Sequence, residues 1–518
     1  MSKFNTKSTT RVSNYMGGKS FSQSAKEELA FSVLSSFLED SYYEKGSDRM
    51  ERISKLVAKT NPEFVSKLAV FARREFHLRS VFHLLVGELS KNCKGNSIVK
   101  NTIIKGVERP DDLLEILAYV GKPVPNQIKK GCREVIKKFN DYQLAKYKGG
   151  SKEYSLVDLF NLVHPKGDRR EWRDLIKGEL KTPDTWETRL SSGENKTEIW
   201  RDLVLNDKLG YMALLRNLRN IVKEGDAETI RKSCEIISDD ERVRSSKQFP
   251  FRFLSALKAL EEFDDEGIAF EKEKSSIEEI KEAVNKALEI SISNLPLLEG
   301  RTLILSDNSG SMRGDSYGVS LLSRFSKRTT ADIANLFATL YWKRADNTLI
   351  GLFGDRLITP KLDRDKDIFE NFKILDKEGD NCGGATETGI FEMFRKLIDG
   401  KVKVDRIVIF SDCQVGEECK WYDSGLLKGN DLNKLFEHYK RINPNVNVYS
   451  VDLKGYGNKM FANGVYLIAG FSEKIFTLME YIEKKEGFVK YIENYYRLNN
   501  RLNTLKQKTN KEPLEWLK

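Results

Sequence analysis

The chain has 518 residues, 40% hydrophobic and 10% aromatic, a composition that supports a large core and excludes a disordered protein. This length corresponds to roughly three folding units, and no apolar run reaches the ~18 residues needed to cross a bilayer, which excludes transmembrane classes. The formal net charge of +10 divides into +13 for residues 1–260, −8 for 261–300 and +5 for 301–518, so we expect at least two modules. The basic part suits a polyanion such as nucleic acid, or it is a solvated lysine-rich surface; composition alone leaves both open.

Residues 1–23 are predicted to form a polar N-terminal arm, because they are rich in Ser and Thr and lack the apolar run of a secretory signal. The cysteines contain no CxxC pair, which argues against a disulfide framework and against cysteine zinc sites. We therefore expect a reduced, cytoplasmic protein. The six cysteines are Cys93, Cys132, Cys234, Cys382, Cys413 and Cys419.

Residues 24–290 have the pattern of successive short helices. Apolar residues recur at helical spacing, as in Phe64–Phe76 and Tyr211–Ile221, and prolines separate the segments. Many short helices of similar length favour an α-solenoid over one compact bundle. The acidic segment Glu261–Lys286 is expected to be the helix that joins this region to the next.

From residue 296 to 483 short apolar strands alternate with helical segments, which predicts an α/β doubly wound parallel sheet. Residues 484–518 are expected to form a helical tail, with tyrosines and leucines at helical spacing in its first part. The strand-like runs are Thr302–Ser306, Leu349–Phe353, Arg406–Phe410, Val446–Val451 and Val465–Ala469.

Hard oxygen ligands follow the predicted strands at three places. The loop after the first strand offers Asp307, Ser309 and Ser311, the turn Gly383–Thr388 offers Thr386, and the strand Ile407–Phe410 leads to Asp412. Ligands bind at the carboxyl ends of strands in such sheets, and this donor set suits octahedral Mg²⁺ or Mn²⁺. The alternative is structural: Asp307 caps a helix and Asp412 a turn.

This set of three motifs resembles the metal-ion-dependent adhesion site (MIDAS) of von Willebrand factor A domains. The resemblance implies a binding module without catalysis, in which a ligand carboxylate can complete the metal shell. A phosphatase of the Asp-x-Asp type would need an acid at Ser309, and no P-loop lysine follows Gly384. A metal-dependent hydrolase therefore stays a weaker alternative.

The helical region resembles the TROVE module, the RNA-binding module of Ro autoantigens and telomerase- and vault-associated proteins. The resemblance lies in residues 14–21, 41–44, 64–75 with 79–80, Leu209–Leu218 and Pro250–Leu254. With an A-like domain directly after it, the chain resembles a Ro protein, of a bacterial or phage-like kind. That family implies HEAT-like repeats bent into a ring, which binds Y RNAs on its outer surface and single-stranded 3′ ends of RNA in its central hole.

Residues 91–150 carry 13 Lys and Arg against 6 Asp and Glu, and basic helical rows of this kind neutralise phosphates. Lys146, Lys148 and the segment ending in His164 match the stretch through which Ro proteins hold Y RNA. The intervening loop has one extra residue, so the second basic position of the family is Lys152 or absent. The structural alternatives are that His164 caps a helix and that Lys148 is solvated surface.

Two further arginines, Arg216 and Arg219, are ambiguous, because they fit either single-stranded phosphates in a cavity or ion pairs between repeats. The sequence thus predicts a non-enzymatic, monomeric RNA-binding ring that acts in RNA quality control or as a tether for an exoribonuclease. The alternative is a metal-dependent protein-interaction module whose basic helical surface binds acidic partners.

Overall fold

The computed structural model describes most of the chain between residues 11 and 495. The described residues are 11–13, 19–21, 25–34, 46–148, 153–181, 184–193, 195–265, 271–314, 329–345, 347–415, 431–454, 460–461, 464–469, 474–484 and 488–495.

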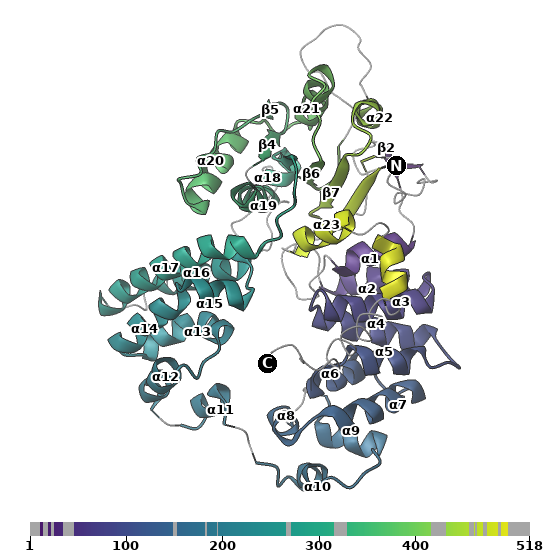
Figure 1. The fold of residues 1–518 in the computed structure, drawn as a ribbon, viewed down its shortest axis with the longest axis vertical. Coiled ribbons are helices and arrows are strands. Elements are labelled where there is room, and N and C mark those ends of the chain that lie inside the picture. The colour runs from purple at the N-terminus through teal and green to yellow at the C-terminus, as the bar shows by residue number, and fades with distance from the viewer. Residues whose placement is uncertain are drawn as a thin grey trace, which may run out of the picture.

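The N-terminal half of the chain is helical, apart from the short antiparallel pair β1 (Arg11–Ser13) and β2 (Lys19–Phe21). In Figure 1, α1 to α9 form one arm below the sheet domain, α10 lies at the far end, and α11 to α17 form a second arm. The helices are α1 Ala25–Leu34, α2 Gly46–Ala58, α3 Pro62–Arg74, α4 Arg79–Asn92, α5 Ile98–Gly106, α6 Pro110–Val120, α7 Asn126–Val135, α8 Asp141–Lys146, α9 Leu156–Val163, α10 Arg170–Lys177, α11 Trp186–Leu190, α12 Lys196–Leu205, α13 Tyr211–Glu224, α14 Ala227–Ile237, α15 Asp240–Ser246, α16 Pro250–Asp265 and α17 Glu271–Ser291.

Local sequence signals set many of these helix ends. Pro62 and Pro110 occupy the first positions of α3 and α6, where a missing N–H costs no hydrogen bond. Asn61 accepts a hydrogen bond from the backbone N–H of Glu63, and Ser155 forms a capping box with Asp158 at the start of α9. The prolines and polar caps therefore divide the region into short helices.

The C-terminal half contains a six-stranded sheet in the order β5-β4-β3-β6-β7-β8. Every neighbouring pair is parallel except β4 with the edge strand β5, which is antiparallel. The strands are β3 Thr302–Asp307, β4 Thr348–Phe353, β5 Leu357–Ile358, β6 Arg406–Ser411, β7 Asn447–Asp452 and β8 Val465–Ala469. The helices of this half are α18 Gly310–Arg313, α19 Thr330–Arg344, α20 Ile368–Asp380, α21 Thr388–Asp399, α22 Leu432–Ile442 and α23 Lys474–Lys484.

The two faces of the sheet belong to different cores. On β3, Leu303 and Leu305 pack with α21 and α22, whereas Ile304 belongs to a core that runs on into the helical arms. The alternation along one strand thus binds the sheet to the helices on both sides, as expected for a doubly wound fold.

The second arm contacts the sheet domain through α16, α17 and the segment that follows. The ring centroids of Phe251 and Phe337 are 4.8 Å apart, and Glu289 accepts a hydrogen bond from the backbone N–H of Ile368 at 2.7 Å. Arg406, which is 2% exposed, donates to Glu483 and to the carbonyl oxygen of Leu298. This end of the helical region therefore contacts α19 and α20, and the segment after it is bonded to β6.

The first arm contacts the C-terminal part of the chain, so that both ends of the helical region meet the sheet domain. Phe31 of α1 lies against Tyr466 of β8, with ring centroids 6.2 Å apart. Residues 488–495, a helical segment after α23, lie beside α1 in Figure 1. Glu75 accepts hydrogen bonds from the hydroxyls of Tyr481 and Tyr495.

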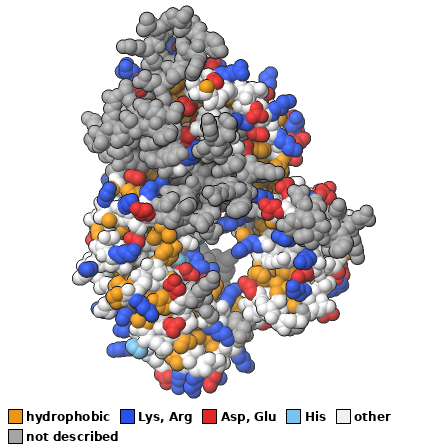
Figure 2. All heavy atoms as spheres, turned by 180° about the vertical axis from the view of Figure 1, so that it is seen from behind, with side chains coloured by type: hydrophobic (Ala, Val, Ile, Leu, Met, Phe, Trp, Pro, Cys, Tyr) orange, Lys and Arg blue, Asp and Glu red, His pale blue; other side chains and the backbone are white. Residues whose placement is uncertain are grey.

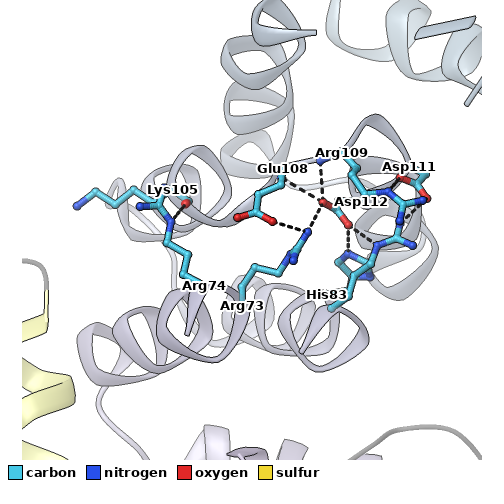
Figure 3. A network of polar contacts seen from close by, with 9 residues as sticks. Arg73, Arg74, His83, Lys105, Glu108, Arg109, Asp111 and Asp112 are labelled. Carbon is cyan, nitrogen blue, oxygen red and sulfur yellow. Dashed lines mark hydrogen bonds and ion pairs between the residues drawn. The ribbon is translucent and has the colours of Figure 1, made fainter. Parts of the chain in front are cut away.

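The first arm contains a buried charged network centred on Asp112 (Figure 3). This residue is 0% exposed, and its carboxylate accepts hydrogen bonds from Arg79 Nε at 2.5 Å and His83 Nε2 at 2.9 Å. It also accepts from the backbone N–H groups of Glu108 and Arg109, at 3.1 and 3.0 Å. One carboxylate thereby connects α4 with the start of α6.

The predicted fold class, a helical solenoid ring followed by a doubly wound α/β domain, is confirmed. The expectation of one helix over Glu261–Lys286 is wrong, because that stretch contains the end of α16 and the start of α17, which pack together. The edge strand β5 and the helix α20 were not predicted. No described helix is both long and apolar enough to span a membrane.

Candidate functional site

The first predicted metal motif begins where β3 ends. Asp307 is the last residue of the strand and is 0% exposed. Its carboxylate accepts hydrogen bonds from the backbone N–H of Ser309 at 2.9 Å and from the hydroxyl of Ser411 at 2.6 Å. The Ser309 and Ser311 hydroxyl oxygens are 3.2 Å apart. The three oxygen ligands of this loop therefore lie close together beside the end of β6.

The second motif approaches the same loop through glycine backbone. Gly310 donates its N–H to the carbonyl oxygen of Gly384 at 3.0 Å, and a Cβ on Gly310 would lie 2.6 Å from that oxygen. Only glycine fits this approach. Thr386, two residues after Gly384, donates its hydroxyl to Asp355 at 2.8 Å and its backbone N–H to the same carboxylate at 2.6 Å. Asp355 thus orients the predicted threonine ligand.

The third motif places Asp412 directly after β6, where it is 2% exposed. One carboxylate oxygen accepts from the backbone N–H of Gln414 at 3.2 Å, and the other lies 3.6 Å from Lys454 Nζ. Lys454 follows β7 and was not among the predicted residues. Only the structure shows that Lys454 pairs with Asp412, because nothing in the local sequence connects the two positions.

The electrostatics of these loops suit a cation. Burial raises the pKa of Asp307 well above its ordinary value, the charge of Asp412 raises it further, and hydrogen bonds from Ser411 and Ser309 oppose the shift. Two carboxylates and several hydroxyls, all hard oxygens, meet at one sheet edge. These residue types fit Mg²⁺ or Mn²⁺, and the residues that would hold the ion are Asp307, Ser309, Ser311, Thr386 and Asp412.

The basic residues predicted to bind RNA lie near the far end of the first arm. Lys146 is the last residue of α8 and is exposed, and α10 contacts both α8 and α9. Lys148 is half-buried, and its ammonium donates to the carbonyl oxygen of Leu180 at 3.0 Å. Of this pair, Lys146 is the more accessible to a phosphate. Lys152 lies outside the described residues.

His164 is exposed and ends α9 in a left-handed conformation, with φ of 45°. Its backbone N–H donates to the carbonyl oxygen of Phe160 at 2.9 Å, so the structural role considered for it, at a helix end, is real. That role uses the backbone and leaves the imidazole on the surface. A hydrogen bond from the ring to RNA is therefore compatible with the cap.

Several basic side chains nearby have structural partners. Arg133 donates to the carbonyl oxygen of Val163 at 2.6 Å, and the guanidinium of Arg109 lies 4.7 Å from the ring centroid of Tyr147. Tyr142, in contrast, is 50% exposed and lies one helical turn before Lys146 on α8. It is an aromatic surface residue that the charge pattern did not single out.

Of the two ambiguous arginines, Arg219 lies over the ring of Phe263, 5.2 Å from its centroid, which supports a structural role between helices α13 and α16. Arg216 is exposed on α13. On the face opposite to that of Figure 1, basic and acidic side chains are interspersed over both helical arms (Figure 2). The basic side chains that the structure describes therefore form no continuous patch on that face.

Comparisons with known proteins match parts of the chain and its overall fold. The TROVE domain model matches residues 175–293. Telomerase protein component 1 of Mus musculus is 35% identical over 109 residues and that of Rattus norvegicus 35% over 111, each 21% of this chain but 4% of those proteins. The crystal structure of the Deinococcus radiodurans Ro (RSR) protein has a TM-score of 0.61 at 16% identity, covering 90% of this chain and 99% of that one.

The domain match covers the second arm, whereas the basic residues of α8 and α9 lie before it. The structural match extends over nearly the whole of both chains, the sheet domain included. The TROVE domain supports an RNA-binding function of the ribonucleoprotein type. Residues 175–293 of the chain therefore match the TROVE domain, and the chain has the fold of the Deinococcus radiodurans Ro protein, as its sequence motifs indicated.

Proposed function

We propose that this protein is a non-catalytic, monomeric RNA-binding ring of the cytoplasm. It holds a structured, Y-like small RNA on the surface of α8, α9 and α10, and it receives single-stranded 3′ ends of RNA in the opening between its arms. In this role it acts in RNA quality control or as a tether for an exoribonuclease. The observation that carries the proposal is the match of the TROVE domain, joined to an exposed lysine and histidine on neighbouring helices of the first arm.

Removing the lysines is expected to weaken binding of the structured RNA in a salt-dependent way. Each phosphate contact that is lost should reduce the slope of log K against log salt by roughly 0.7–0.9. Lys146→Ala with Lys148→Ala should therefore flatten the slope, whereas His164→Ser should weaken binding with less change, since a neutral imidazole supplies a hydrogen bond. Filter binding in a KCl series, with a Y-like hairpin and a single strand, measures both effects.

Lys196→Ala is the matched control, because Lys196 is an exposed lysine on the second arm that pairs with Glu224 at 2.7 Å. It should leave the affinity for the hairpin unchanged. Equal losses for hairpin and single strand in the Lys146 and Lys148 variant would show one shared site. No loss of affinity for either RNA would show that these lysines are solvated surface residues without a role in RNA binding.

We also propose that the sheet domain binds Mg²⁺ or Mn²⁺ through Asp307, Ser309, Ser311, Thr386 and Asp412. When bound, the ion would accept an anionic oxygen from a partner, which is binding chemistry without turnover. The support for this is the donor set itself, brought to one edge of the sheet by three loops. Asp307 and Asp412 would supply the negative charge, and Asp355 would hold Thr386 in position.

Asp307→Ala is expected to abolish divalent-ion binding, because it removes a carboxylate from the centre of the site while the sheet core stays intact. Isothermal titration calorimetry with Mn²⁺ measures the loss. Asp405→Ala is the control, since Asp405 lies just before β6 at the opposite, amino end of that strand, where it bonds to the backbone of Arg301. Unchanged binding by the Asp307 variant would favour the capping interpretation.

A further inference from the structure

A lysine reaches the candidate metal centre from a fourth strand end. Lys454 Nζ donates a hydrogen bond to the carbonyl oxygen of Ser311 at 2.6 Å and lies 3.6 Å from Asp412 Oδ2. The side chains of Lys454 and Asp412 are only 11% and 3% exposed. The ammonium thus lies among the loops that carry two of the proposed metal ligands.

The backbone holds Lys454 in this position. The N–H of Lys454 donates to Asp452 Oδ1 at 3.2 Å, and the N–H of Leu453 donates to the carbonyl oxygen of Ser411 at 2.9 Å. The loop after β7 is therefore fixed to the end of β6, next to Asp412. These two hydrogen bonds hold the base of the Lys454 side chain within reach of Asp412.

The other basic side chain near this loop, Arg313, pairs with acids other than Asp412. Arg313, at the end of α18, donates to Asn308 at 3.1 Å and pairs with Asp376 and Asp380. Its charge is thus matched by acids of α20. Lys454 is the basic side chain that the described part of the chain pairs with Asp412.

A divalent cation and the Lys454 ammonium cannot both be held closely by Asp412. Each is attracted by the carboxylate, but like charges a few ångströms apart in a largely buried site repel one another strongly. We propose that Lys454 is a built-in counter-ion that competes with the divalent cation for Asp412 and so sets the metal affinity of this domain. The inference rests on the proposed metal site and adds the residue that regulates it.

Lysine suits this role because its charge is compact and its stem is flexible. The ammonium can turn to solvent when a metal ion enters and can neutralise Asp412 when no ion is present. The domain then keeps its fold without metal, and its affinity for the ion is lowered by the free energy needed to displace the lysine. Removing the lysine should therefore strengthen metal binding and lower the stability of the metal-free protein.

The test compares the full-length wild-type protein with Lys454→Met, which keeps most of the apolar stem and removes the charge. We expect Lys454→Met to bind Mn²⁺ more tightly by roughly tenfold or more in calorimetry. In EDTA its melting temperature should be lower than that of the wild type, and addition of Mn²⁺ should raise it by more. Lys454→Gln repeats the test with a polar side chain in case the methionine variant does not fold.

Lys440→Met is the matched control. Lys440 is a half-buried lysine of the same domain whose ammonium donates to the carbonyl oxygens of Pro444 and Val446, both at 3.2 Å. Its replacement should leave Mn²⁺ affinity unchanged. Adding Asp307→Ala to Lys454→Met should remove the binding, which would locate the ion at this site.

Three outcomes would contradict the proposal in different ways. Equal Mn²⁺ affinity of the wild type and Lys454→Met would show that the lysine does not compete. Weaker binding by Lys454→Met and Lys454→Gln would show that the lysine supports the site. No Mn²⁺ binding by any variant would remove the metal site itself, and the role of Lys454 with it.

Discussion

Replacing Asp112 by alanine is expected to lower the free energy of unfolding by about 3–5 kcal/mol, among the largest effects of any single change in the chain. The carboxylate accepts hydrogen bonds from Arg79 and His83, so its removal takes the acidic partner from the buried His83 and one of two acidic partners from Arg79, which also pairs with Asp111. It also removes the acceptor for the backbone N–H groups that begin α6. Urea denaturation followed by circular dichroism measures the loss.

The control is Asp112→Asn, which keeps the shape and one acceptor oxygen but removes the charge. It should be less destabilising than alanine. Conversely, Asp111→Ala, at a neighbouring acid whose side chain is 20% exposed, should cost much less, because partly exposed ion pairs contribute little. An equal loss for Asp111→Ala and Asp112→Ala would show that burial of the network does not determine its contribution.

The same residue gives a pH dependence with a definite sign. Burial acts to raise the pKa of Asp112, but hydrogen bonds and charges from His83 and Arg79 outweigh it and hold the pKa well below 3.8. A carboxyl with a depressed pKa in the folded state stabilises the protein above its unfolded pKa and loses that contribution as the pH falls below it. The stability difference between wild type and Asp112→Asn should therefore shrink below about pH 4.

The sequence predicted the fold class because the two halves of the chain differ in hydrophobic period. Apolar residues such as Phe64, Leu68 and Ala72 recur with the helical period, while Ile407–Phe410 is a continuous apolar run typical of a strand covered on both faces. The single helix predicted over Glu261–Lys286 was wrong, because acidic composition says nothing about where the chain reverses. The edge strand β5 was missed because its two residues are too few to show the alternating hydrophobic pattern of a strand.

The placement of the proposed metal ligands at one sheet edge was predictable for those residues that follow strands. Asp307 and Asp412 were found because each comes directly after an apolar run, and parallel strands end at one edge. Asp355 and Lys454 were not found, because their partners Thr386 and Asp412 are 31 and 42 positions away in the chain. Tyr142 was missed because exposure of a side chain depends on which helices pack around it.

Phe71→Ala is expected to release the C-terminal contact of the first arm as well as to destabilise the protein. Phe71 is 0% exposed and its ring centroid lies 5.6 Å from that of Tyr481, 6.0 Å from Phe488 and 5.2 Å from Tyr495. Losing this ring should lower the free energy of unfolding by about 3–5 kcal/mol through the lost burial and the cavity left behind.

The loss should be concentrated at one contact, because Phe71 joins α3 to residues from the other end of the chain. Backbone amides of residues 488–495 should therefore exchange with solvent faster in Phe71→Ala, at denaturant concentrations where the arms keep their protection.

Phe160→Ala is the matched control. Phe160 is 2% exposed and packs on Trp172 at the far end of the same arm. Its replacement should lower the free energy of unfolding by a similar amount without affecting residues 488–495. Hydrogen exchange read by mass spectrometry separates the two, and equal protection of residues 488–495 in both variants would show that the C-terminal segment is held independently of Phe71. Faster exchange in Phe71→Ala alone would instead identify this aromatic contact as the place where the helical ring closes on its own C-terminus.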